Sequence, residues 1–191
     1  MVFASSNNYK VKQIKDLCKD KIDICGLKDV NINVEVEEDG ASFEENATKK
    51  AVAIFNLTHQ EVLADDSGLC IDIFDDWPGV YTHRFLPNST AEERNKVIIE
   101  KMQNVDDSLR GARNICVLCY CNKEGKTKIY KGVVKGTIAN KPRGNNVFGF
   151  DPIFLLKNNK TLAELTDEEK IEVNARSLAF KAFLQDYTNK K

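Results

Sequence analysis

Two groups of polar residues in this sequence have the side-chain types and spacing that phosphate and metal chemistry requires. Ser5-Ser6-Asn7-Asn8-Tyr9-Lys10 precedes a helical pattern, where hydroxyls, backbone N–H groups and the positive end of a helix suit an anion. The segment lacks the glycine spacing of a Walker A loop, and an ordinary helix cap also explains it. Asp65-Asp66 at a predicted strand end and Glu44-Glu45 on a predicted helix offer hard oxygen ligands of the kind that Mg²⁺ takes. Such acid pairs are also explained as solvent-exposed caps without a metal.

Aromatic and basic residues elsewhere could complete a nucleotide site. Phe148-Gly149-Phe150-Asp151-Pro152 combines aromatic faces, a flexible glycine and a carboxylate, so this loop either stacks on a base or is pinned to the core by its phenylalanines. Taken singly, the cations Lys10, Lys50, Lys170 and Arg176 are ordinary surface charges. Together with the acids they match what a nucleoside triphosphate needs, which is cations for its phosphates, a metal site and a slot for its base.

The composition limits the class of protein. The chain has 191 residues, enough for one domain with a substantial core, and we expect a single domain over 1–191. Its 28 Lys and Arg nearly balance its 29 Asp and Glu, which argues against nucleic acid or a membrane surface as partner. The first residues resemble no export signal, so we expect a cytoplasmic protein. Cys116, Cys119 and Cys121 lie in an apolar run and are expected to be buried thiols.

Hydrophobic periodicity predicts the elements that must position these residues. Strand patterns alternate along the chain with helical repeats, which is typical of an α/β domain with a mixed sheet. In the second predicted helix, Asn46 and Lys50 are four residues apart and should project together from one face. We predict strands over 2–4, 31–37, 62–64, 69–74, 115–120, 129–138 and 153–156, and helices from residues 8, 42, 89 and 166, the last running unbroken to about 182.

The order of these segments resembles the inosine triphosphate pyrophosphatase family, whose members hydrolyse non-standard purine nucleoside triphosphates to the monophosphate and pyrophosphate. The resemblance runs in order from residue 4 to residue 176. The matching segments are Ala4 to Lys10, Phe43 to Ala47 with Lys50, Ala64 to Leu69, Pro78 to Tyr81, Phe148 to Phe154, and Ala163 to Thr166 with Glu169 and Lys170.

The resemblance implies a two-lobed α/β fold around a long mixed sheet, with flanking helices, a cleft between the lobes, a homodimer and a Mg²⁺ requirement. It also implies a role for each matching residue. Asp66, as general base, Lys10 and Asp65 would be catalytic, and Glu45 and Asp66 would hold the metal. Ser5, Asn7, Lys10, Lys50 and Lys170 would bind the phosphates of the substrate, and Ser67 would also bind the substrate. Phe148, Gly149, Phe150, Asp151, Ala175 and Arg176 would form the base pocket.

One departure from the family pattern concerns the base pocket. The family carries Ser-His-Arg where this chain has Asn174-Ala175-Arg176. Ala175 can neither hydrogen-bond nor stack, whereas the arginine remains and can donate to a 6-oxo group but not to the 6-amino group of adenine. His59 and His83 lie outside the matching motifs, and we expect neither to act in catalysis.

The leading hypothesis is therefore a Mg²⁺-dependent pyrophosphatase for ITP, dITP and XTP. A related septum-inhibitor type of pyrophosphatase, acting on dTTP or UTP, is the nearest enzymatic alternative. A nucleotide-binding module with weak catalysis is the alternative from another class, motivated by the missing histidine.

Overall fold

A six-stranded mixed sheet organises the chain in the computed structural model, which describes residues 1–18, 21–82, 84–146 and 148–189. The strand order is β2-β1-β3-β4-β5-β6. The strands are β1 (Val2–Phe3), β2 (Cys25–Gly26), β3 (Val62–Ile71), β4 (Gly111–Cys121), β5 (Thr127–Ile138) and β6 (Phe154–Leu155). β1 pairs in parallel with both β2 and β3, and β5 pairs antiparallel with β6. The predicted α/β class with a mixed sheet is confirmed.

The described residues form five α-helices beside the sheet: α1 (Asn8–Cys18), α2 (Phe43–Thr58), α3 (Ala91–Lys101), α4 (Asp167–Val173) and α5 (Ala175–Thr188). The chain forms two compact units. Unit 1 comprises Met1–Asp66, Cys116–Gly132 and Arg176–Lys191, and unit 2 comprises Ser67–Ile115 and Val133–Ala175. The resemblance implies a two-lobed fold, but no feature of the sequence marks where this division falls.

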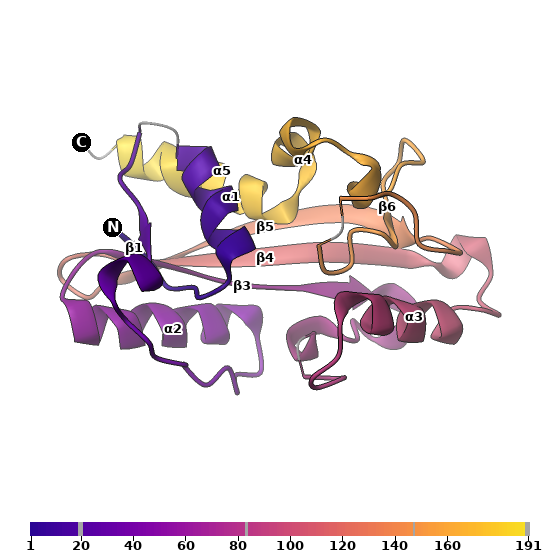
Figure 1. Cartoon of the computed structure of the whole chain (residues 1–191), viewed down its shortest axis with the longest axis horizontal. Coiled ribbons are helices and arrows are strands. Elements are labelled where there is room, and N and C mark those ends of the chain that lie inside the picture. The colour runs from indigo at the N-terminus through magenta and orange to yellow at the C-terminus, as the bar shows by residue number, and fades with distance from the viewer. Residues whose placement is uncertain (19–20, 83, 147, 190–191) are drawn as a thin grey trace. The chain divides into compact units, whose positions relative to one another are not determined.

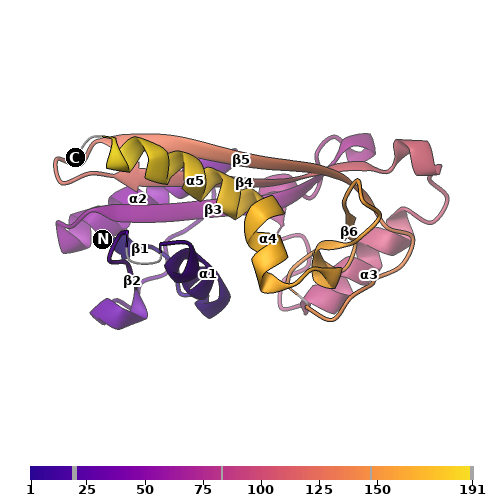
Figure 2. The same ribbon diagram turned by 90° about the horizontal axis from the view of Figure 1, so that it is seen from above.

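In unit 1, helices cover both faces of the strands. α1 and α5 lie on one side of the strands and α2 lies on the other (Figures 1 and 2). Phe3, Leu63 and Leu118 are wholly buried on the strands, and Ile54 of α2 and Phe180 of α5 are at most 1% exposed. Burying each such side chain contributes about 1.5–3 kcal/mol, so this double layer fixes the helices against the strands.

Unit 2 has a hydrophobic core of its own, between α3 and the segment that follows β5. Ile98 and Met102 pack with Ile138, Ile153 and Phe154, and all five are at most 1% exposed. In Figure 1, α4 lies above the strands of this unit and α3 lies below them. A capping box formed by Thr90 and Glu93 begins α3, the helix predicted from residue 89.

Several predicted elements differ from the structure. Residues 31–37, predicted as a strand, form none, and the sheet edge is instead the two-residue β2. The strands predicted over 62–64 and 69–74 are one strand, β3, and residues 72–74 form a 3-10 helix after it. The predicted last helix is two helices, α4 and α5, which break at Asn174. Asn174 is extended, with φ −89° and ψ 152°, and its side chain donates to the carbonyl of Lys170 at 2.6 Å. Periodicity alone missed the break because apolar spacing continues through it.

β4 and β5 form a hairpin, closed by a bond from Asn122 N to Lys126 O at 2.9 Å. Cys116, Cys119 and Cys121 are buried free thiols. Among the described residues, no helix is long and apolar enough to cross a membrane.

Candidate active site

The two adjacent acids of β3 face opposite sides of the sheet. Asp65 and Asp66 lie inside this ten-residue strand, not at its end as predicted. Successive side chains of a strand point to opposite faces. Accordingly, the partners of Asp65 come from α1 and α5, whereas the hydrogen-bond partner of Asp66 comes from α2. One short strand segment thereby places a carboxylate in each helical layer of unit 1.

Asp65 anchors two buried cations. Its Oδ2 atom lies 3.0 Å from Lys10 Nζ, and it accepts bonds from Arg176 Nη2 at 3.0 Å and Nε at 3.2 Å. The Asp65 side chain is 1% exposed, and the Lys10 and Arg176 side chains are 10% and 7% exposed. Burial alone would raise the pKa of Asp65, but the charges of Lys10, Arg176 and Lys50 hold it well below its ordinary value. Asp65 therefore stays ionised and is a poor proton acceptor.

Arg176 is fixed from both ends of its guanidinium. Besides the two bonds to Asp65, its Nη1 donates to Gln13 Oε1 at 2.6 Å. Gln13 belongs to α1 and Arg176 is the second residue of α5, so this network joins two helices through one strand residue. Gln13 was not predicted as a site residue. Its position three residues after Lys10, on the same helix, is the only signal that the sequence gave.

Asp66 has the opposite electrostatic character. Burial raises the pKa of its carboxyl group above the ordinary value, against the lowering effects of the Lys50 charge and the hydrogen bond from Asn46. The charge of Glu38 raises it further. The pKa of Asp65 is thus lowered and that of the adjacent Asp66 is raised. Such a difference is expected where one of two acids serves as a base near neutral pH.

Lys50 interacts electrostatically with three carboxylates. Its Nζ atom is 2.9 Å from Glu38 Oε1. Burial alone would lower the pKa of Lys50, but the charges of Asp65, Glu38 and Asp66 raise it above its ordinary value. Asn46 and Lys50 both reach this cluster from α2, so the predicted shared face is confirmed.

Glu38, whose carboxylate contacts Lys50, was missed by the sequence analysis. Glu45 was expected to hold a metal, but the structure shows Glu45 bonded to the backbone at the start of α2. Glu45 is exposed, and its Oε2 accepts a bond from Ala41 N at 2.8 Å, while its own N–H donates to Ser42 Oγ at 3.1 Å. Those bonds cap α2. The signal for Glu38 was the acidic run before Gly40, which the strand assignment over 31–37 obscured. In the described part of the chain, no three metal-ligating side chains gather at one point.

The predicted phosphate segment is a helix cap in this structure. Asn7 Oδ1 accepts bonds from Tyr9 N at 3.0 Å and Lys10 N at 3.3 Å, and Ser5 Oγ accepts one from Asn7 N at 3.2 Å. This cap starts α1 so that Lys10 points from its first turn to Asp65. The exposed Asn7 and half-buried Ser5 therefore sit beside the positive end of the helix.

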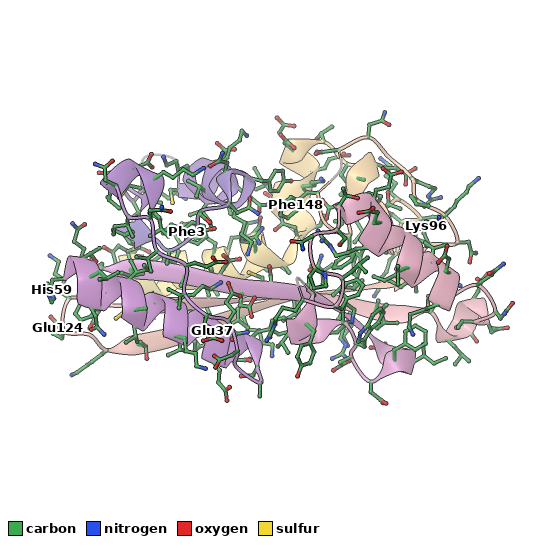
Figure 3. All side chains as sticks on the ribbon, turned by 60° about the horizontal axis from the view of Figure 1, so that its bottom comes forward. Phe3, Glu37, His59, Lys96, Glu124 and Phe148 are labelled. Carbon is green, nitrogen blue, oxygen red and sulfur yellow. The ribbon has the colours of Figure 1, made fainter. Side chains whose placement is uncertain are left out.

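In unit 2 the structure brings Asp151 and Lys170 together. Lys170 Nζ lies 2.8 Å from Asp151 Oδ2 and 2.9 Å from the carbonyl of Asn146, and its side chain is 4% exposed. Phe150 is buried in the core of this unit, which confirms that it pins the loop, whereas Phe148 is only partly buried (Figure 3). Gly149 has φ +54°, a left-handed conformation that favours glycine.

The remaining predicted residues have simple surroundings. Ser67 is the one half-buried residue of β3, and Ala175, 3% exposed, begins α5. His59 ends α2 in an exposed position, at the opposite end of the helix from Glu37 (Figure 3). His83 lies outside the described residues.

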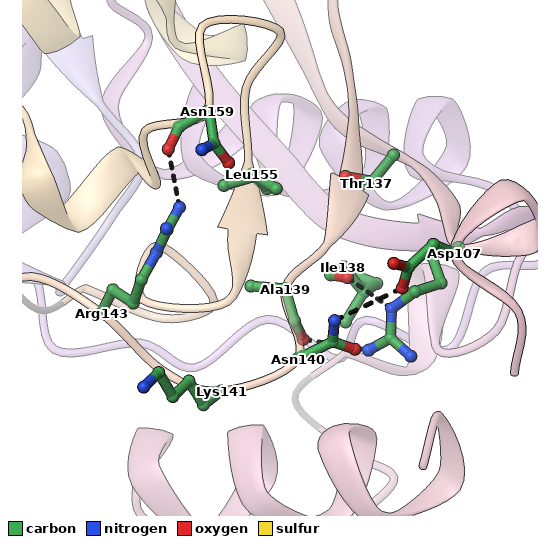
Figure 4. Close-up of a pocket in the computed structure, with 10 residues that line it drawn as sticks. Asp107, Thr137, Ile138, Ala139, Asn140, Lys141, Arg143, Leu155 and Asn159 are labelled. Carbon is green, nitrogen blue, oxygen red and sulfur yellow. Dashed lines mark hydrogen bonds between the residues drawn. The ribbon is translucent and has the colours of Figure 1, made fainter. Parts of the chain in front are cut away.

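A separate pocket of about 350 Å³ lies within unit 2 (Figure 4). The arginines that line it are bonded to the backbone. Arg110 donates to the carbonyls of Ile138 at 2.7 Å and Ala139 at 3.0 Å, and Arg143 donates to that of Asn159 at 2.8 Å. These bonds hold the loop after β5, so both arginines have a structural role.

Comparisons with known proteins agree with the resemblance found in the sequence. The Ham1 family model matches residues 1–186. The dITP/XTP pyrophosphatase of Bacillus licheniformis is 38% identical over 184 residues, covering 95% of this chain and 94% of that protein. The dITP/XTP pyrophosphatase of Bacillus subtilis is 37% identical over 183 residues, covering 94% and 92%.

Solved structures of the same family share the fold. The Staphylococcus aureus Ham1 protein superposes with a TM-score of 0.89 at 33% identity, covering 100% of this chain and 98% of that one. A HAM1 protein from Coxiella burnetii gives a TM-score of 0.89 at 35% identity, covering 98% of each chain. With its family model, its relatives and its fold in agreement over nearly the whole length, the chain belongs to the Ham1 family.

Proposed function

We propose that this chain is a nucleoside triphosphate pyrophosphatase that converts non-standard purine nucleotides such as dITP, XTP and ITP to the monophosphate and pyrophosphate. The observation that carries the proposal is the pair of buried acids on β3. Lys10 and Arg176 keep Asp65 ionised on one face of the strand, and the pKa of Asp66 is raised on the other face. Membership of the Ham1 family and similarity to dITP/XTP pyrophosphatases supply the substrate class.

Asp66 suits the role of general base. In the reaction a water oxygen attacks the α-phosphorus, the bond from that phosphorus to the oxygen bridging the β-phosphate breaks, and pyrophosphate leaves. Asp66 would accept the proton of the water, because its raised pKa makes it the better proton acceptor of the two acids. Lys10 and Lys50 would neutralise phosphate oxygens on which charge develops, and Ser5 and Asn7 would bind phosphate beside the end of α1.

Mg²⁺ fits the acids of unit 1 when the substrate supplies the other ligands. Glu38 and Asp66 are close enough for their charges to interact, and Lys50 contacts Glu38. Two carboxylates without a third match Mg²⁺, which keeps several waters and is completed by substrate phosphates. We assign Glu38 and Asp66 as its protein ligands, with Glu45 holding the start of α2. When bound, the metal would neutralise phosphate charge and favour departure of pyrophosphate.

Base selection is assigned to Arg176, and the loop from Phe148 to Asp151 is kept as a separate candidate for stacking on a base. A guanidinium only donates hydrogen bonds, so it suits the 6-oxo group of hypoxanthine or xanthine and not the 6-amino group of adenine. The bonds to Asp65 and Gln13 fix where the Arg176 guanidinium lies. Ala175 contributes no polar contact to the base, and ATP is expected to be a poor substrate because a mismatched base leaves polar groups unpaired.

The proposal also includes a homodimer and a place in the cytoplasm, where the nucleotide pool lies. Light scattering on the purified protein tests the first, and fractionation of cells tests the second.

The function is tested by pyrophosphate release from a panel of ITP, XTP, dITP, GTP, ATP, UTP and dTTP, with Mg²⁺ and with EDTA. Wild type is compared with Asp66→Asn, and Asp72→Asn serves as the matched control because its side chain is 54% exposed and pairs with Arg113. We expect metal-dependent pyrophosphate release from ITP, XTP and dITP and none from ATP. Asp66→Asn should lose this activity, and the control should keep it. Turnover confined to UTP and dTTP, or saturable ITP binding without any release, would contradict the proposal.

A further inference from the structure

The segment before α2 is held in place by the first turns of that helix. Residues 38–41 belong to no helix or strand of the described chain, and four side-chain bonds tie them to α2. Lys50 contacts Glu38 at 2.9 Å, Lys49 contacts Asp39 at 2.5 Å, Asn46 accepts from Gly40 at 2.8 Å, and Glu45 accepts from Ala41 at 2.8 Å.

Asn46 also forms a hydrogen bond with an acid of β3. Its Nδ2 donates to Asp66 Oδ2 at 2.9 Å, and its Oδ1 accepts from Gly40 N at 2.8 Å. Asn46 is 0% exposed, so water cannot take over either bond. The backbone N–H of Gly40 can only donate, so it requires the amide oxygen and leaves the amide nitrogen for the carboxylate. One side chain therefore fixes both the segment that carries Glu38 and the orientation of Asp66.

Gly40 fits this contact closely. A Cβ added at Gly40 would lie 2.6 Å from Asn46 Oδ1 and 2.9 Å from Glu45 Cβ. No methyl group can be accommodated unless the segment moves away from Asn46. The absence of a side chain at residue 40 thus allows the backbone to reach the amide.

We propose that Asn46 is a positioning residue that holds Glu38 and Asp66 in place so that they bind one divalent cation together. This inference rests on the proposed function for the role of the two carboxylates. Asn46 contacts neither water nor substrate in this scheme. It acts by holding one ligand directly and the other through Gly40, and such supporting contacts typically change metal affinity or activity by about 10- to 100-fold.

The test uses two variants that disturb the contact from opposite sides. Asn46→Leu keeps a similar volume and removes both bonds, and Gly40→Ala pushes the segment away while every polar side chain remains. Lys49→Ala is the matched control, because it removes a bond to the same segment from the same helix through a pair whose side chains are 46% and 56% exposed. The readouts are kcat and KM for ITP at saturating Mg²⁺, Mn²⁺ binding to the nucleotide-free protein by electron paramagnetic resonance, and the melting temperature.

We expect kcat to fall about 10- to 100-fold in both variants and Mn²⁺ affinity to fall about 10-fold or more, with KM for ITP little changed and the control like wild type. A purely structural role would lower the melting temperature without this selective loss. Folded variants with wild-type kcat and wild-type Mn²⁺ affinity would overturn the proposal, and Gly40→Ala decides the question if Asn46→Leu does not fold. If the wild-type protein releases no pyrophosphate from ITP but both variants bind Mn²⁺ more weakly than wild type, the positioning role is supported and the proposed function is refuted.

Discussion

Replacing Asp65 by Asn should destabilise the protein strongly while changing the shape of the side chain very little. The substitution removes the negative charge that lies 3.0 Å from both Lys10 Nζ and Arg176 Nη2. All three side chains are at most 10% exposed, so solvent cannot replace the lost partner. Two cations are then left buried around a neutral amide.

The magnitude follows from this burial. Removing one partner of a buried ion pair costs about 3–5 kcal/mol, because the remaining charge stays desolvated. For a chain of this size each kcal/mol shifts the melting temperature by about 2–4 °C, so the variant should melt roughly 6–20 °C below wild type. An exposed pair contributes only about 0.2–1 kcal/mol, so Asp72→Asn should melt within a few degrees of wild type.

The pH dependence of the free energy of unfolding provides a second test of the same interaction. The folded-state pKa of Asp65 is lowered, so its contribution is complete above the unfolded-state pKa of about 3.9 and is lost as the pH falls toward the folded-state value. The difference in stability between wild type and Asp65→Asn should therefore be constant from about pH 5 to pH 8 and shrink only in strong acid.

Urea unfolding followed by circular dichroism at several pH values, together with thermal melts, measures both quantities. Asp72→Asn is unfolded in parallel. A folded Asp65→Asn protein with a free energy of unfolding within about 1 kcal/mol of wild type at pH 7 would refute the reasoning, since a surface pair would give that value.

Four further outcomes are expected. Lys50→Met should move the acid limb of the pH profile of kcat to higher pH, because the Lys50 charge lowers the pKa of Asp66 and the base must be ionised to act. Lys170→Met should lower the free energy of unfolding by about 3–5 kcal/mol, because it leaves a carboxylate 2.8 Å away without its buried cation. Gly144→Ala should lower the melting temperature, because φ is +88° and the new Cβ would lie 2.3 to 2.5 Å from three backbone atoms. His59→Ala should leave turnover unchanged, because this residue is exposed at the end of α2.

Each outcome has a measurement that can contradict it. A pH profile of Lys50→Met with an acid limb at or below that of wild type would contradict the first, with Lys49→Met as the control for loss of a surface charge. Urea unfolding checks Lys170→Met and differential scanning calorimetry checks Gly144→Ala, and wild-type values in either would exclude the stated contact. A large loss of kcat in His59→Ala would show that this histidine takes part in the reaction.

The sequence determined most of the local structure. Asn7 and Thr90 begin helices through hydrogen bonds to residues two or three positions away, and the hairpin after Cys121 closes over five residues. Interactions of this short range depend on residues that are neighbours in the chain, so patterns of type and spacing reveal them. The spacing of Asn46 and Lys50 likewise fixed their shared face in advance.

Only the tertiary structure decided which carboxylates belong together. Asp65 and Asp66 are adjacent in sequence, yet the strand sends them to opposite helical layers, and their pKa values move in opposite directions. The charges of Lys10, Arg176 and Lys50 together outweigh the effect of burial at Asp65, whereas burial and the charge of Glu38 raise the pKa of Asp66. Glu38 joins Lys50 across twelve residues, and Arg176 joins Asp65 across 111. Electrostatic partners of this kind depend on distance in space, which the strand order and the packing of three helices set and no local pattern encodes.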